Sequence, residues 1–471
     1  MSNSTSFPLQ DLKDWAPVSQ SKAFEKAIAN ISPADGQPGS VLASPSTSDP
    51  NYYFHWVRDA ARTMRTLVAT DYLPMDMDKF DAAIKSYVEF SKINQTVPTL
   101  SNSLGEPKFY VSGSAYDLPW GRPQNDGPAE RAIALTRWVN LLMKEKDSAY
   151  VVEVLYDGKE PSASVIKADL DFVGHHWQDP CFCLWEEVDG THFYTRMQQR
   201  TALREGAALA TLLNDPGAAD FYNQQAQLIE ADMERFWDAQ NNHIKTTIDQ
   251  VGGLNYKYSN LDIAIILGAC YGYSKDFPFY TPHHDRVLAT GYAIHQAFLP
   301  LYPINSITQT TDGDAVYPGI GRYQEDIYNP NGGKANPWFL CTLAMSSLCY
   351  QASKLFNDDQ VIKVTAQNIN FLSMAIDMAY KIAMPKKPLT IKEGDNITPQ
   401  KDLFNTIVTG LAAMGDAYLR RVQYHGATDG SLSEQFDLNT GYMLSARDLT
   451  WSYIALIIAI DERNGTPIND N

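Results

Sequence analysis

Apolar residues recur every three or four positions over most of the chain, which is the spacing of one face of an α-helix. Strict alternation of apolar and polar residues, the mark of a half-buried strand, is scarce. The pattern therefore predicts an all-α protein. The predicted helical segments are 21–31, 57–70, 79–93, 128–145, 161–177, 196–214, 217–237, 260–271, 285–301, 336–356, 358–383, 402–421 and 447–463.

Long stretches rich in glycine, proline and aromatic residues separate some of these helices. Loops of such length in a compact domain usually carry function. Because no Ser/Thr/Pro-rich linker interrupts the helical pattern, we expect residues 1–471 to form one domain, with the loops gathered at one end. We expect no linker and no separate binding module. The four loops are 32–56, 101–127, 303–335 and 424–446.

Composition narrows the classes of partner. The chain has 471 residues, of which 44% are hydrophobic, enough for a large core. Its formal net charge of −17 argues against nucleic acid and anionic membranes as partners. No apolar run reaches the ~18 residues of a membrane span.

The N-terminus has neither a basic n-region nor an apolar h-region. Either the protein is not secreted, so that it is intracellular or vacuolar, or its signal peptide has been removed. Asn-X-Ser/Thr sequons fit a secreted protein. They occur at Asn3, Asn30, Asn94, Asn396 and Asn464.

Cysteine usage predicts a fold that does not depend on disulfides. An odd count of five leaves at least one free thiol. Cys341 and Cys349 lie eight residues apart on one predicted helix, ~12 Å apart and too far to bridge. His175 and His176 precede Cys181 and Cys183, which raises the alternative of a zinc site. That spacing matches no common zinc pattern, so we expect no metal.

The segment Cys181–Thr195 carries the most informative chemistry. Glu186 and Glu187 directly follow a tryptophan inside an apolar, aromatic run. Desolvation and like-charge repulsion favour the protonated form of such a carboxyl group, which can then donate a proton near neutral pH. A surface turn with two solvated glutamates is the alternative.

Further candidates lie in the long loops. Aromatic residues lead into an Arg-Asp pair at Arg58 and Asp59, and such rings and charges suit sugar rings and hydroxyl groups. Glu434 is a second carboxylate in an aromatic-flanked loop and the candidate base opposite the acid. The Gly-X-Gly at Gly319 is not a dinucleotide fingerprint, because no strand precedes it and the third glycine is missing.

Five motifs, in order along the chain, resemble those of glycoside hydrolase family 15, the fungal and yeast glucoamylases. They are Tyr-Phe-X-Trp-X-Arg-Asp, Trp-Gly-Arg-Pro-Gln-X-Asp-Gly-Pro, Leu-Trp-Glu-Glu, Gly-Arg-Tyr-X-Glu-Asp with Asn-Pro-Trp-Phe-Leu, and Glu-Gln followed by Ser-Ala-Arg-Asp-Leu-Thr-Trp-Ser. They span residues 51–452. The resemblance implies an (α/α)6 barrel of two concentric helix rings.

The resemblance also implies roles for individual residues. By its place in the motifs, Glu186 resembles the general acid of the family, and Glu434 resembles its general base. Trp120 resembles the indole that supports the acid, and Arg122 belongs to the same motif. The other residues implied in substrate binding are Arg58, Asp59, Glu187, Arg322, Tyr52, Trp56, Trp185 and Trp338. One departure is Cys183, which stands where family members often have an aspartate.

The implied activity is exo-acting, inverting hydrolysis of terminal α-1,4-linked glucose, and more slowly of α-1,6-linked glucose, with release of β-D-glucose. Starch, glycogen and maltooligosaccharides are the implied substrates of a secreted, monomeric enzyme without a cofactor. One alternative is an exo-glucosidase of the same fold that acts on trehalose, isomaltose or dextran. Another is a non-catalytic glucan-binding or regulatory protein, against which the retention of both carboxylates argues.

Overall fold

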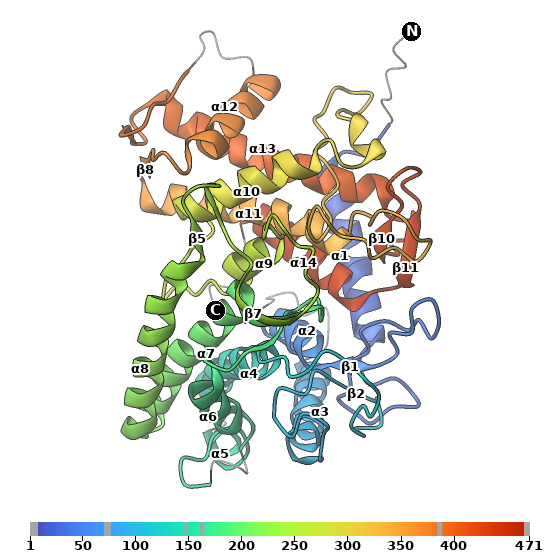
Figure 1. Ribbon diagram of the computed structural model, residues 1–471, viewed down its shortest axis with the longest axis vertical. Helices are drawn as coiled ribbons and strands as arrows, with labels where there is room; N and C mark the ends of the chain where they lie inside the picture. Colours follow the sequence, from blue (N-terminus) through green and yellow to red (C-terminus); the bar gives the residue numbers. More distant parts are fainter. Residues whose placement is uncertain (1–7, 70–76, 146–147, 161–163, 384–388, 466–471) are drawn as a thin grey trace.

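A computed structural model describes residues 8–69, 77–145, 148–160, 164–383 and 389–465. Within these residues, six helices contact one another in sequence order, and the last contacts the first, which closes an inner ring. In the ribbon of Figure 1 they surround the centre of the molecule. They are α2 (Val57–Ala69), α4 (Asp126–Glu145), α7 (Phe193–Leu212), α9 (Ala264–Tyr271), α11 (Phe339–Asp359) and α14 (Thr450–Arg463).

The remaining long helices lie outside this ring, and the chain alternates between the two layers except at α12 and α13, which follow one another. The predicted all-α (α/α)6 barrel is therefore confirmed. The outer helices are α1 (Leu12–Ala29), α3 (Met77–Thr96), α6 (Val165–His176), α8 (Pro216–Asp232), α10 (Asp285–Phe298), α12 (Ile369–Ala383) and α13 (Asp402–His425). Short helical turns are α5 (Ser148–Tyr150), η1 (Val151–Leu155), η3 (Met233–Phe236) and η4 (Pro303–Ser306).

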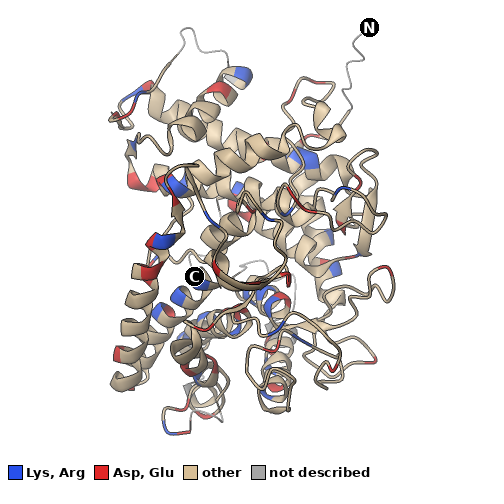
Figure 2. Cartoon of the chain, viewed as in Figure 1, with Lys and Arg blue, Asp and Glu red and all other residues tan. Residues whose placement is uncertain are grey.

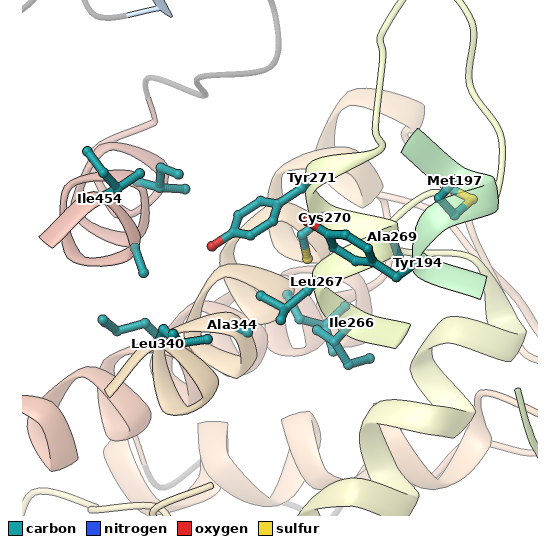
Figure 3. Packing of buried hydrophobic residues seen from close by; sticks show 14 of the residues in the cluster. Tyr194, Met197, Ile266, Leu267, Ala269, Cys270, Tyr271, Leu340, Ala344 and Ile454 are labelled. Atoms are coloured by element: carbon teal, nitrogen blue, oxygen red, sulfur yellow. The ribbon is translucent and has the colours of Figure 1, made fainter. Parts of the chain in front are cut away.

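Helix α9 lies inside the barrel because its sequence is apolar on every face. All eight residues of α9 are buried, and Figure 3 shows Ile266 and Leu267 of this helix near Leu340 and Ala344 of α11. Helix α9 has no charged residue, and the charges of α11 and α14 come towards their C-terminal ends (Figure 2). No helix in the described ranges is long and apolar enough to cross a membrane.

Short antiparallel strands connect the helices, although the sequence pattern predicted few strands. Their small size explains why alternation did not reveal them. The pairs are β1 (His55–Trp56) with β2 (Lys108–Phe109), β5 (Trp237–Asp238) with β6 (His243–Ile244), β8 (Ile362–Lys363) with β9 (Asn396–Ile397), and β10 (Ser433–Phe436) with β11 (Met443–Arg447). A three-stranded sheet joins β3 (Cys181–Phe182), β4 (Val188–His192) and β7 (Thr247–Gly253).

Two predicted helix bounds are wrong. The single segment 358–383 divides, because Gln360 takes the left-handed conformation (φ 57°) at the C-cap of α11, and β8 precedes α12. Helix α1 begins at Leu12 instead of residue 21, because the side chain of Asp11 accepts a hydrogen bond from Lys13 N and caps the helix.

Candidate active site

A cavity of about 540 Å³ lies where the loops lead into the inner helices. Each of the four long loops contributes to its wall, as expected for functional loops. The lining residues are Ala43, Pro50, Asn51, Tyr52, Trp56, Arg58, Asp59, Trp120, Gly121, Leu184, Trp185, Glu186, Glu187, Arg322, Tyr328, Trp338, Leu340, Glu434, Leu449 and Trp451. This set includes every residue assigned from the sequence to catalysis or substrate binding except Arg122.

Glu186 lies in the tight turn between β3 and β4 and takes a left-handed conformation with φ 66°. Its N–H donates to Cys183 O at 2.8 Å, which closes the turn. Gly121 passes close to this turn, since a Cβ atom there would lie 2.6 Å from Glu186 O. The turn thus depends on an unusual backbone conformation and on a glycine from another loop.

Three side chains contact the same oxygen of Glu186. Trp56 Nε1 donates to Oε1 at 2.6 Å and Gln124 Nε2 at 3.0 Å. Arg58 Nη2 lies 3.9 Å from this oxygen. All three contacts therefore fall on Oε1 of Glu186.

Glu187, the neighbouring carboxylate, belongs to a second charged group. Arg322 Nη2 lies 2.7 Å from Glu187 Oε1, and Tyr323 OH donates to Oε2 at 2.8 Å. The guanidinium of Arg322 also donates two hydrogen bonds of 2.7 Å to Asp326. This bidentate pairing fixes the plane of the guanidinium at the pocket wall.

Glu434 projects from β10, with only 1% of its surface exposed. Gln435 Nε2 donates to Oε2 at 2.9 Å, and Ser445 Oγ donates to the same oxygen. Burial raises the pKa of Glu434 to about 7, although hydrogen bonds from Ser445 and Tyr52 and the charge of Arg322 oppose the rise.

Arg58 and Asp59 lie in the first turn of helix α2 and line the cavity. Arg58 Nη1 donates to Gln124 Oε1 and to Asp126 Oδ2, both at 2.9 Å, and Arg58 Nε lies 3.6 Å from Asp59 Oδ2. Burial raises the pKa of Asp59 to about 7; the charge of Arg58 opposes this rise, and Glu186 adds to it. The charge of Asp59, and so the net charge of the Arg58–Asp59 pair, therefore changes with pH close to neutrality.

Aromatic rings form most of the remaining wall. Trp185 meets Trp338 edge-on at 5.7 Å between ring centroids and stacks on Trp451 at 6.4 Å. On the opposite loop, Trp56 lies edge-on to Tyr52 at 5.5 Å and to Trp120 at 6.1 Å. Such faces suit the C–H surfaces of a sugar ring.

The structure gives Trp120 and Arg122 particular places. The indole that donates a hydrogen bond to Glu186 is Trp56, whereas Trp120 lines the cavity beside it. Arg122 does not line the cavity: its Nε donates to Glu106 Oε1 at 2.9 Å and its Nη1 to Leu118 O at 3.0 Å. Arg122 therefore holds the loop that carries Trp120.

The sequence interpretation assigned no role to several residues that the structure brings to the site. They are Gln124, Asp126, Tyr328, Ser445 and Trp451. All but Tyr328 lie inside the quoted motifs, so the motifs could have identified them as site residues. Tyr328 lies outside them, and its OH is 3.1 Å from that of Tyr52.

The zinc alternative gains no support from the geometry. His175 and His176 are exposed on α6, whereas Cys181 and Cys183 are buried. Throughout the described ranges, no group of three or more His, Cys, Asp or Glu side chains is placed to hold a metal ion. All five cysteines are buried, and none of them forms a disulfide.

Paired carboxyl groups in one cavity are the groups that most glycoside hydrolases use. The family model "Glycosyl hydrolases family 15" matches residues 17–461. The chain is 36% identical to "Glucoamylase" of Blastobotrys adeninivorans, over 95% of this chain and 72% of that protein. It is also 36% identical to "Glucoamylase 1" of Rhizopus oryzae, over 97% and 72% of the two chains.

A solved structure, "Glucoamylase from Saccharomycopsis fibuligera at atomic resolution", superposes with a TM-score of 0.84 at 29% identity, over 99% of this chain and 98% of that one. The chain therefore belongs to glycosyl hydrolases family 15 and is an enzyme of the glucan 1,4-α-glucosidase (glucoamylase) class.

Proposed function

We propose that the enzyme removes glucose from the non-reducing ends of starch, glycogen and maltooligosaccharides with inversion, so that β-D-glucose is the first product. Terminal α-1,4 bonds are cleaved fastest and α-1,6 bonds more slowly. The observation that carries the proposal is that Glu186 and Glu434, from loops far apart in the sequence, line one cavity.

The two carboxyl groups have different surroundings: Trp56 and Gln124 contact Glu186, whereas Gln435 and Ser445 contact the buried Glu434. Glu186 is proposed as the general acid: it protonates the glycosidic oxygen as the C1–O bond breaks. Glu434 is proposed as the general base, which accepts a proton from the water that attacks C1 on the opposite face. Inversion requires room for this water, so the carboxyl groups should lie roughly 6.5–9.5 Å apart.

The other polar residues suit substrate binding. We assign Arg58 and Asp59 to the hydroxyl groups of the terminal glucose, and Glu187 and Arg322 to the sugars around the scissile bond. Charged groups fixed by buried partners can hold hydroxyl groups in one orientation. A cavity of about 540 Å³ accepts a chain end more readily than the middle of a polymer, which supports exo action.

Anomer-resolved NMR of freshly digested maltoheptaose tests this function. The expected first products are β-D-glucose and maltohexaose. Initial α-D-glucose would exclude inversion, and short internal fragments would exclude exo action. Parallel digests of maltose, isomaltose and trehalose compare the linkages; faster release of glucose from trehalose or isomaltose would contradict the proposed preference.

We also propose that the enzyme acts outside the cell. The sequons differ in burial: Asn30 and Asn94 are buried, whereas Asn396 and Asn464 are exposed. If the protein passes through the secretory pathway, mass spectrometry should find a glycan on Asn396 and none on Asn30 or Asn94. Protein from the native host without any glycan on Asn396 would count against secretion.

A further inference from the structure

A buried ion pair lies behind the turn that carries Glu186. Lys257 Nζ is 2.7 Å from Asp262 Oδ2, and the two side chains are 9% and 0% exposed. Neither residue lines the cavity. Burying two charges costs free energy, so such a pair is weak evidence for added stability. Its position beside the Glu186 turn suggests a role in holding that turn.

Asp262 holds the residue before Glu186. Trp185 Nε1 donates to Oδ1 of Asp262 at 3.0 Å and to Oδ2 at 3.1 Å. The indole N–H is thus shared between the two oxygens of one buried carboxyl group. The contact therefore sets the orientation of the Trp185 ring at the pocket wall.

Lys257 is linked through Tyr323 to Glu187, the residue after Glu186. Its Nζ lies 3.9 Å from the ring centroid of Tyr323, and Tyr323 OH donates to Glu187 Oε2 at 2.8 Å. The backbone continues this connection, because Leu254 N donates to Glu187 O at 2.9 Å. Both neighbours of Glu186 are thus held from the segment 254–262.

Glu186 needs this support because of its backbone conformation. A non-glycine residue with φ 66° is in a sparsely populated region, and it keeps that conformation only where its surroundings determine it. A turn that relaxed would move the carboxyl group relative to the substrate. Errors of about 1 Å in the position of a catalytic group can cost ~100-fold in rate.

We propose that Lys257 and Asp262 are positioning residues that fix Trp185 and Glu187 and thereby present Glu186 to the glycosidic oxygen. The proposal rests on the proposed function for the role of Glu186. The hydrogen bond between Trp185 and Asp262, in contrast, is tested without any activity.

The first measurement is the NMR signal of the Trp185 indole N–H, assigned by its loss in Trp185→Phe. We expect this signal to move upfield in Asp262→Leu, which removes the acceptor, and less in Asp262→Asn/Lys257→Met, which retains a neutral acceptor. An unchanged signal would overturn the proposal. If Asp262→Leu does not fold, the double variant gives the same test.

The second measurement is kcat/KM on maltose well below the unfolding temperature. We expect a loss of at least ~10-fold in Asp262→Leu and a partial recovery in Asp262→Asn/Lys257→Met. The exposed pair Glu89 and Lys92, changed to Gln and Met, is the control and should leave kcat/KM unchanged.

Coupling separates positioning from a general loss of stability. Trp185→Phe and Asp262→Leu each remove the same hydrogen bond, the one from Trp185 to Asp262. The double variant should therefore have a kcat/KM no lower than that of the less active single variant. The proposal would be overturned if the losses of kcat/KM in Trp185→Phe and Asp262→Leu multiplied in the double variant. It would also be overturned if Asp262→Leu and Asp262→Asn/Lys257→Met lost the same amount of kcat/KM. A wild-type enzyme that releases no glucose would instead refute the proposed function and leave the NMR test in force.

Discussion

Trp56 and Glu186, 130 residues apart, are joined by a hydrogen bond of 2.6 Å from the indole Nε1 to Oε1. The bond connects β1, directly before α2, with the turn between β3 and β4. It occupies the oxygen that Gln124 also contacts. The orientation of the proposed acid therefore depends on the packing of separate loops, and this dependence guides the predictions below.

Replacing either proposed catalytic carboxyl group with an amide should abolish most turnover. We expect Glu186→Gln and Glu434→Gln each to lower kcat by at least ~100-fold, because general acid–base catalysis contributes about 10²–10⁴-fold. Steady-state kinetics on maltoheptaose, with circular dichroism to confirm folding, is the measurement. Turnover close to wild type in either variant would refute the assignment of that residue.

Ser445→Ala should move the acidic limb of the kcat/KM profile to higher pH. The hydroxyl group of Ser445 donates to Glu434 and favours its ionised form, so its removal should raise the pKa of Glu434 above about 7. The pH dependence of kcat/KM reports the essential base of the free enzyme. Ser306→Ala, at an exposed serine, is the control and should leave the limb in place. A shift to lower pH in Ser445→Ala would show that Glu434 is not the base.

Glu434→Gln should stabilise the protein increasingly as pH rises from 4.5 to 7. Burial raises the pKa of Glu434 from 4.5 to about 7, so the folded state holds a proton that the unfolded state has lost. Stability contributed by this group therefore falls across that window, by on the order of 3 kcal/mol.

The measurement is the difference in Tm between Glu434→Gln and wild type at pH 4.5 and 7.5. Asp59 and Glu462, whose pKa values burial also raises to about 7 and about 8, are present in both proteins and cancel in the difference. A Tm difference that is equal at both pH values would contradict the raised pKa of Glu434.

The two arginines of the motifs should respond differently to substitution. Arg58→Lys should lower kcat/KM by ~100-fold, because a lysine cannot reproduce the fork that contacts Gln124 and Asp126 at the cavity. Arg122→Met should mainly lower Tm, because Glu106, 1% exposed, loses its cationic partner.

Thermal melts and kinetics on maltose compare the two variants. A large loss of kcat/KM with an unchanged Tm in Arg122→Met would show that Arg122 binds substrate after all, as the resemblance first implied.

Much of the architecture was predictable because it is local. The 3.6-residue period of apolar positions lies in the chain itself, and a helix that is apolar all round, such as α9, has to be buried. The motifs also led to Glu186, Glu434 and most of the lining residues, since residue type and order were enough to recognise them. Short strands and the helix break at Gln360 were not predictable, because β pairing and a left-handed cap give little periodic signal.

The sequence by itself thus determined the helices, the family and the candidate carboxylates. Only the tertiary structure decided which side chains meet. It showed that Trp56 contacts Glu186, that Arg122 faces Glu106, and that Asp262 holds Trp185. The physical reason is that these contacts join loops whose relative positions depend on packing of the whole barrel, which no local pattern of residues records.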